Sequence, residues 1–335
     1  ARMSAEPRDT PGRRIAGLVL LAAAVVALFL ASLAIGSVAI PLGDVVAILS
    51  GEPAARASWA TIVLEFRLPK ALTAALAGAA LAVGGLLMQT LFRNPLAGPY
   101  VLGISAGASL GVALVVLTIG GVTTELLAGV GLIGEFGLIT AASLGAGAVL
   151  GLVVLAARRV SSLTLLILGV LFGYATSALV TVLMHFSLAE RIQAYIVWTF
   201  GSFGGVTWSQ LRVLAPALLV GLVLAALASK PLNALLLGER YARSMGVAVG
   251  RTRLGVLVST ALLAGGVTAF CGPVGFVGVA VPHLARGLLR CADHRILIPG
   301  AALAGALVAL ASDLVAQLPG SDAVLPLNAV TALIG

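Results

Sequence analysis

The chain has 335 residues, of which 60% are hydrophobic and only 10% are charged, and its formal net charge is +8. Because a soluble domain carries about 25% charged residues, this composition excludes a water-exposed globular surface and indicates a membrane protein. A positive charge of this size can follow from membrane orientation alone, so it gives no support to a nucleic-acid partner.

From the N-terminus onward, we expect residues 1–12 to form a flexible tail and residues 13–335 to form a single transmembrane domain. A helix of about 20 apolar residues crosses the hydrocarbon core of a bilayer. The first apolar run is longer than the apolar part of a signal peptide, which favours a retained helix. Such runs predict about ten spans, at 15–36, 70–92, 100–118, 136–157, 163–186, 210–229, 254–270, 272–291, 296–317 and 326 onward.

The basic residues are distributed unevenly between the two sides of these spans. If the N-terminus lies inside, all but five of the 20 basic residues fall in inner segments. The five exceptions are Arg56, Arg67, Lys70, Arg191 and Arg212. This imbalance follows the positive-inside rule and predicts a cytoplasmic N-terminus.

Two longer segments connect spans on the outer side. Residues 37–69 are predicted to hold a short surface helix with turns. Residues 190–208 include Trp198 and Trp208, and tryptophans at this depth usually mark the headgroup region. An interfacial helix and turn is therefore favoured for this segment over a role in stacking on a substrate.

Two short turns stand out on the inner side. The first, Arg93–Pro99, contains two prolines, which end helices and make a rigid elbow. Asn94 could point its amide into the space that the elbow faces, although a simple turn that ends a helix fits equally well. The second turn, Arg158–Leu163, combines a basic membrane anchor with a serine cap for the next helix.

The longest inner segment, Lys230–Arg253, is basic and amphipathic. Its apolar side chains recur at roughly helical spacing, namely Leu235, Leu236, Leu237, Tyr241 and Met245. Such a helix could lie on the lipid surface. Gly238 and Gly246 divide it into two short pieces, however, and this favours insertion into a groove on a partner protein.

Several kinds of chemistry are missing from the sequence. It contains no phosphate-binding loop motif, no cluster of metal-ligating residues and no serine-protease arrangement. We therefore predict neither enzymatic activity nor a cofactor. The spans also carry few charges, and Asp313 is the one clear candidate for an ion pathway. A contact at the outer end of its helix is favoured over that role.

Short motifs between residues 67 and 313 follow one another in a specific order. They are Arg67–Lys70, Gly78–Ala82 with Gln89, Arg93–Pro99, Leu102–Ala108, Leu237–Gly246, Gly275–His283 with Arg286, and Asp293–Arg295. Each motif is weak alone. In this order they resemble the FecCD-type permeases, the membrane subunits of type II ABC importers for iron chelates, haem and vitamin B12.

The resemblance implies an all-α, polytopic membrane protein with about ten transmembrane helices per subunit, in the type II ABC importer permease fold. It also implies a homodimer whose pathway is lined largely by the fifth and tenth helices. The other expected partners are two cytoplasmic ABC ATPase subunits, a periplasmic or lipid-anchored substrate-binding protein, and membrane lipid. The expected location is the bacterial inner membrane. Members usually continue several residues past the position of Gly335.

The resemblance further assigns roles to residues. Residues 231–250 correspond to cytoplasmic coupling helices, in which the contacts with the ATPase are Leu237, Gly238, Glu239, Arg240, Arg243 and Gly246. The cytoplasmic gate corresponds to Asn94, Leu96, Ser161, Ser162 and Leu163. Docking of the binding protein corresponds to Arg67 and Lys70, whereas Gln317 stands where members often carry another basic residue. His185 is a candidate for the substrate pathway, and His283 is expected to be a packing residue.

The predicted function is that of a permease subunit without enzymatic activity, which takes up an iron chelate, either haem or a ferric siderophore, through a homodimer pathway. ATP hydrolysis is expected in a separate subunit. Vitamin B12 is the alternative cargo, because permeases for all these compounds share the motifs above. The alternative of another class is an ion-coupled secondary transporter, which needs no partner but requires more buried charge than these spans contain.

Overall fold

A computed structural model describes residues 11–53, 55–118, 137–157, 159–317 and 324–334. Every regular element in these ranges is helical, so the predicted all-α class is confirmed. Of the tail expected over residues 1–12, only Pro11 and Gly12 are described, and both belong to the first helix. The rest of that tail lies outside the described residues.

Each of the ten predicted spans contains a helix in the described part of the chain. These helices are α1 (Pro11–Ala34), α4 (Leu68–Phe92), α5 (Ile104–Thr118), α7 (Gly137–Ala157), α8 (Ser162–His185), α10 (Trp208–Leu227), α13 (Val249–Cys271), α14 (Val277–Leu289), α15 (His294–Ala316) and α16 (Leu327–Ile334). Among the described residues, seven helical stretches are long and apolar enough to cross a membrane, whereas α5 and α14 are shorter apolar helices.

Backbone geometry explains why α14 is shorter than its predicted span of 272–291. Gly272 has φ +73° and Phe276 has φ +67°, so the chain enters the left-handed region twice before the helix begins at Val277. Left-handed residues interrupt a right-handed helix. The predicted span over 100–118 is shortened in the same way, because Gly103 has φ +77° and α5 begins directly after it.

Shorter helices connect the spans. They are α2 (Leu42–Leu49), α3 (Ala57–Thr61), the π-helix η1 (Ile62–Arg67), α9 (Ala189–Thr199), α11 (Ser229–Leu236) and α12 (Glu239–Ser244). The predicted surface helix within 37–69 corresponds to α2. The Trp208 indole N–H donates to the carbonyl of Leu64 over 2.8 Å, which ties the start of α10 to η1. This bond gives Trp208 a structural role.

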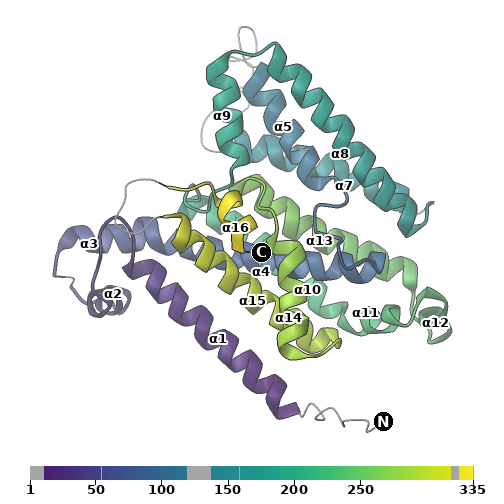
Figure 1. Cartoon of the computed structure of the whole chain (residues 1–335), viewed down its shortest axis with the longest axis horizontal. Coiled ribbons are helices and arrows are strands. Elements are labelled where there is room, and N and C mark those ends of the chain that lie inside the picture. Colours follow the sequence, from purple (N-terminus) through teal and green to yellow (C-terminus); the bar gives the residue numbers. More distant parts are fainter. Residues whose placement is uncertain (1–10, 54, 119–136, 158, 318–323, 335) are drawn as a thin grey trace, which may run out of the picture.

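Helix α4 occupies the centre of the bundle and packs against α10, α13, α14 and α15 (Figure 1). Close approach depends on glycine. A Cβ atom added to Gly78 would overlap the carbonyl oxygen of Gly305 in α15, and one added to Gly305 would overlap that of Gly78. Gly85 lies even closer to the backbone of Gly278 in α14. Small residues therefore bring these helices together, as helix association in lipid requires.

Candidate functional site

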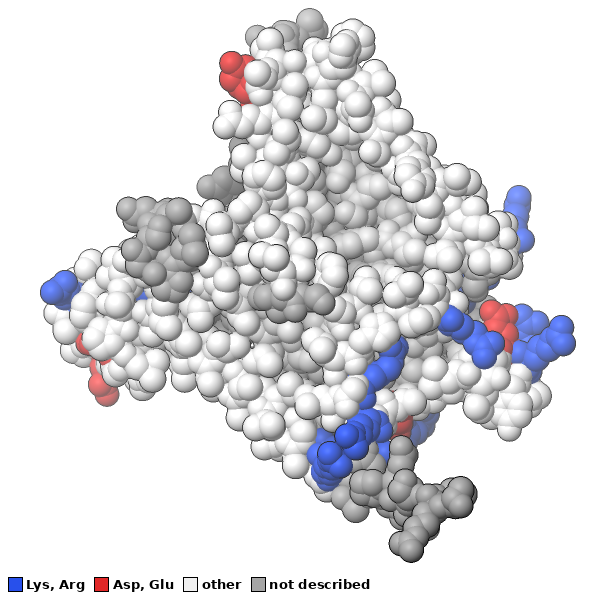
Figure 2. All heavy atoms as spheres, in the orientation of Figure 1, with Lys and Arg blue, Asp and Glu red and all other residues white. Residues whose placement is uncertain are grey.

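The bundle has two ends that differ in charge. The end formed by the turn after α4, by α11 and α12, and by the starts of α13 and α15 is called the basic end here. Figure 2 shows Lys and Arg gathered over this part of the molecule. Its exposed basic side chains include Lys230, Arg240, Arg243, Arg251 and Arg290. The other end, where α8 and α15 finish, is called the opposite end.

Helices α11 and α12 meet at Gly238, which has φ +109° and ψ 153°. This region of backbone geometry is open essentially to glycine alone. Gly246 follows α12 with φ +81°, so the predicted division of the segment by two glycines is found. The inward side of the pair is formed by buried Leu232, Leu235 and Ala242.

The outward side of this pair of helices is apolar. Leu237 is 63% exposed, Tyr241 is 54% exposed and Met245 is 49% exposed. Around them lie exposed charges, with Arg243 paired to Glu239 over 3.5 Å. An apolar patch rimmed by charge typically marks a protein–protein contact, which suits a docking element.

Most of the predicted coupling residues also border a hollow at the basic end. It has a volume of about 860 Å³ and is lined by Leu91, Phe92, Arg93, Leu237, Gly238, Glu239, Arg240, Tyr241, Arg243 and Ser244. Arg93 ends α4 in the left-handed conformation and its guanidinium faces the carbonyl of Leu236 at 3.5 Å. Of the six predicted coupling residues, five line the hollow, and Gly246 does not. Arg93 was not among the predicted coupling residues, because no local pattern in the sequence links it to a segment so far along the chain.

Hydrogen bonds connect α11 to the centre of the bundle. The Asn233 amide donates to Asp293 over 2.6 Å and its oxygen accepts from the backbone N–H of His294 over 2.9 Å. The Nε2 nitrogen of the buried His294 ring lies 2.9 Å from the Thr90 hydroxyl in α4. Asp293 caps α15, and its pKa is lowered because it accepts bonds from the Arg295 N–H and from Asn233. A displacement of α11 would therefore be transmitted to α15 and α4 through these hydrogen bonds.

The first predicted gate turn is held against α14. The Asn94 side chain accepts a hydrogen bond from the backbone N–H of Leu96 over 3.0 Å, so its amide helps to form the turn. The carbonyl of Pro95 lies 2.7 Å from the His283 ring nitrogen, which agrees with a packing role for this histidine. Leu96 itself is 76% exposed at the basic end.

The second gate turn is held against α13 instead. Ser161 caps α8, with its hydroxyl accepting from the Thr164 N–H over 3.2 Å, so the predicted serine cap is confirmed. Ser162 is the first residue of α8, and Leu163 after it is 66% exposed. The Arg253 guanidinium donates to the carbonyl of Val160 over 3.0 Å. The two gate turns thus rest on different helices, and each presents an exposed leucine.

Arg67 and Lys70, the predicted docking residues at the opposite end, differ in their surroundings. The Arg67 guanidinium is buried and donates to three carbonyls. Those of Leu33 and Ala34 are the last two of α1, and that of Val38 lies in the segment after it. It thereby satisfies carbonyl groups that a helix end leaves unpaired. Lys70 lies 3.2 Å from Asp313 and keeps part of its side chain exposed.

Asp313 forms a contact between helices, as sequence analysis favoured. Its carboxylate pairs with Lys70 of α4 and accepts a bond of 2.8 Å from the amide of Gln317. The side chain of Asp313 is 7% exposed, and that of Lys70 is 22% exposed. Members of the family that the sequence resembles often carry a basic residue at the position of Gln317. Here the neutral Gln317 donates to the carboxylate of the Lys70–Asp313 pair.

We expect Asp313→Ala to destabilise the chain by about 2 kcal/mol, because it leaves the ammonium of Lys70 without its partner in a half-buried site. The double variant Lys70→Met with Asp313→Ala should lose less than the single one, since no unpaired charge remains. Thermal unfolding of the detergent-solubilised chain measures both, with exposed Glu190→Ala as the control. Equal losses in the single and double variants would contradict this assignment.

Helix α8 lies at the edge of the molecule (Figure 1) and leaves one long face uncovered in the described structure. Exposed polar residues follow this face at helical spacing: Tyr174, Ser177, Thr181 and His185. Tyr174 is 73% exposed in the middle of a membrane-length helix. The His185 ring packs edge-on against Phe186 at 5.0 Å. Sequence analysis selected only His185, although the spacing of the other three was readable.

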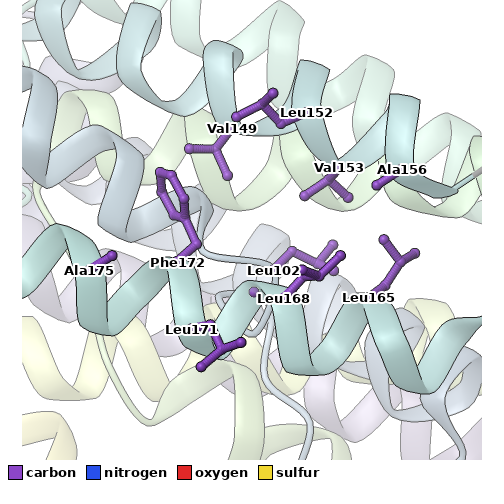
Figure 3. A pocket seen from close by; sticks show the side chains of 11 residues that line it. Leu102, Val149, Leu152, Val153, Ala156, Leu165, Leu168, Leu171, Phe172 and Ala175 are labelled. Atoms are coloured by element: carbon purple, nitrogen blue, oxygen red, sulfur yellow. The ribbon is translucent and has the colours of Figure 1, made fainter. Parts of the chain in front are cut away.

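An apolar cavity of about 470 Å³ lies beside this face, between α7 and α8 (Figure 3). Figure 3 shows Val149, Leu152 and Val153 of α7 facing Leu165, Leu168 and Phe172 of α8 across it. Helix α8 therefore has only loose side-chain contact with α7. The arrangement leaves α8 held mainly by α5.

Comparisons with known proteins agree on one family. The chain matches the FecCD transport family over residues 24–335. It is 40% identical over 275 residues to the vitamin B12 import system permease protein BtuC of Salmonella typhimurium, covering 82% of this chain and 80% of that protein. The corresponding protein of Klebsiella pneumoniae is 39% identical over 274 residues, covering 82% and 79%. A solved metal-chelate type ABC transporter in an inward-facing conformation superimposes with a TM-score of 0.82 and 31% identity, covering 95% of both chains.

Proposed function

This chain belongs to the FecCD transport family as a membrane permease subunit of an ABC importer, and we propose that its cargo is a large metal chelate of low net charge. Within that class we favour a corrinoid of the vitamin B12 type. ATP hydrolysis takes place in a separate subunit, so the alternative of an ion-coupled secondary transporter is excluded.

The uncovered face of α8 carries this proposal. Tyr174, Ser177 and Thr181 give it hydroxyl groups, and α8 contains no Asp, Glu, Lys or Arg. A strongly charged chelate passing through a membrane would lose hydration without gaining a counter-charge here. A neutral or weakly charged chelate needs only apolar surface and hydrogen bonds. The relatives named as vitamin B12 permeases support the same choice.

An iron chelate, which sequence analysis placed first, becomes the second candidate. The observation in its favour is the fold similarity to a metal-chelate type transporter. His185 lies at the end of the polar face of α8, where a cargo would first meet this helix. Its imidazole is exposed and could contact either kind of chelate.

The proposed assembly places two copies with their α8 faces toward a shared pathway. Importers of this kind work with an ATPase and a substrate-binding protein. We place the ATPases on the outward side of α11 and α12, and the binding protein at the opposite end near Lys70. The role of Arg67 there would be indirect, through the loop after α1 that it holds. The basic end and the N-terminus would then be cytoplasmic, in the bacterial inner membrane.

The proposed mechanism follows the contacts described above. Closure of the ATPases would push on Leu237 and Tyr241. The bonds of Asn233 to Asp293 and His294 would transmit this displacement to α15 and α4. Because α4 leads directly into the turn of Leu96, its movement would open one of the two gate turns. The movement would reach the other turn, at Leu163, through the contact of α12 with α13.

Transport of candidate cargoes tests the proposal. The chain is reconstituted into liposomes with its ATPase and binding protein, and ATP-driven uptake of cobalamin, haem and a ferric siderophore is measured. We expect cobalamin uptake to exceed the other two by about tenfold, and Tyr174→Asp to reduce it by about tenfold while Tyr174→Phe has little effect. Preference for haem or a siderophore would overturn the corrinoid assignment. Unchanged uptake by Tyr174→Asp would overturn the pathway along α8.

A further inference from the structure

An apolar groove runs along the outer surface where α7, α10 and α13 meet. Its cavity has a volume of about 270 Å³ and is lined by small and apolar residues, among them Gly147, Leu150, Ala217, Ala261, Gly265 and Phe270. No acidic or basic side chain is among the described residues that line it. This surface has the character of one that accommodates a hydrocarbon chain.

At the basic end, α7 and α13 border a second cavity. It has a volume of about 510 Å³ and is lined by Val154, Ala157, Arg159, Val160, Gly250, Arg251, Arg253 and Leu254. Its α7 residues continue the helical spacing of those in the apolar groove. On α13, Leu254 precedes Ala261 by two helical turns, or about 10 Å. The two cavities therefore follow one another along the line where α7 and α13 meet, and together they are called the groove here, the second being its polar part and the first its apolar part.

Three of the described arginines line the polar part, and Arg253 among them has donor groups without an acceptor. Arg253 uses one terminal nitrogen for the carbonyl of Val160, whereas its Nε and second terminal nitrogen are buried without a hydrogen-bond partner. No carboxylate is among the described residues that line this cavity, and the nearby Glu239 pairs with Arg243. Buried guanidinium donors without acceptors are unusual, and an anion would satisfy them.

We propose that this groove binds an anionic glycerophospholipid, with the lipid phosphate on Arg159, Arg251 and Arg253 and an acyl chain along the apolar part. A zwitterionic lipid would bring its ammonium toward the arginines, so a headgroup with net negative charge is favoured. A free phosphate ion could meet the arginines but would make no use of the groove. The arginines of the polar part match the phosphate of a lipid, and the apolar part matches its acyl chain.

Native mass spectrometry of the full-length chain in detergent tests this site with phosphatidylglycerol, phosphatidylcholine and inorganic phosphate as probes. We expect phosphatidylglycerol to be retained roughly tenfold more than phosphatidylcholine. Arg159→Gln with Arg251→Gln should reduce that retention by about tenfold. The same change at the opposite end, Arg212→Gln, should leave it unaltered.

The acyl-chain part is tested by a pair of glycines on α7. A Cβ atom added at Gly147 or at Gly151 meets nothing within 4 Å, so we expect the fold to accept a larger side chain at either position. Only Gly147 lines the groove, so Gly147→Leu should lower phosphatidylglycerol retention while Gly151→Leu should not. Equal binding of both lipids, or no effect of the arginine pair, would overturn the proposal. Complete displacement by millimolar phosphate, or loss of dimer rather than lipid in Gly147→Leu, would assign the surface to a free anion or to a second copy.

Discussion

We expect the variant Gly78→Val to leave almost no folded chain in the membrane. The first side-chain atom would overlap the carbonyl oxygen of Gly305 and the side chain of Ala309, both in α15. Backbone cannot move aside as a flexible side chain does, so α4 and α15 would have to separate. Because α4 is the central helix, the cost should exceed about 4 kcal/mol, which is rare for a single substitution.

The yield of monodisperse protein after extraction and its thermal unfolding temperature measure this effect. Gly255→Val in α13 is the matched control, since a side chain at Gly255 meets nothing within 4 Å. We expect Gly255→Val to behave as the unmodified chain. A normal yield and unfolding temperature for Gly78→Val would show that α4 and α15 do not pack as described.

The second large effect should be on transport rather than on folding. We expect Gly238→Val to reduce ATP-driven uptake by about tenfold or more, since a valine at φ +109° and ψ 153° costs about 1–3 kcal/mol of backbone strain. Relief of this strain would reorient α12 relative to α11. The outward apolar side chains Leu237 and Tyr241 would then no longer present one surface to the proposed ATPase.

Uptake by the reconstituted complex and co-purification of the ATPase measure the effect of Gly238→Val. The unfolding temperature should stay close to that of the unmodified chain, because a Cβ atom at Gly238 would meet no atom closer than 3.6 Å. Gly255→Val again serves as the control. Full uptake by Gly238→Val would remove α11 and α12 from the proposed coupling path.

These two glycines differ in how far the sequence alone explains them. Gly238 lies between two short amphipathic pieces, and a glycine in that place predicts a break in the helix whatever surrounds it. Gly78 belongs to a run of small residues in which no position is distinguished by its neighbours in sequence. Only the packing of α4 against α15 selects Gly78 from that run.

The charged residues show the same difference. The prediction that Asp313 makes a helix contact was correct, but its partner Lys70 lies in another span and could not be identified from spacing. Docking of a binding protein is the role that the resemblance gives to Arg67, and in the structure its guanidinium lies among carbonyls at the end of α1. Long side chains of this kind can point outward or inward, and the sequence does not distinguish these directions.

The sequence by itself determined the helical class, the places of the apolar helices along the chain and the serine cap of α8. These features depend on composition and on interactions within a few residues, which are present in the chain before it folds. The tertiary structure alone decided which glycines touch, which charges pair, and that Arg93 lies beside Gly238. It also brought Arg159, Arg251 and Arg253 to one groove. Such contacts depend on the relative placement of whole helices, which helical periodicity does not encode.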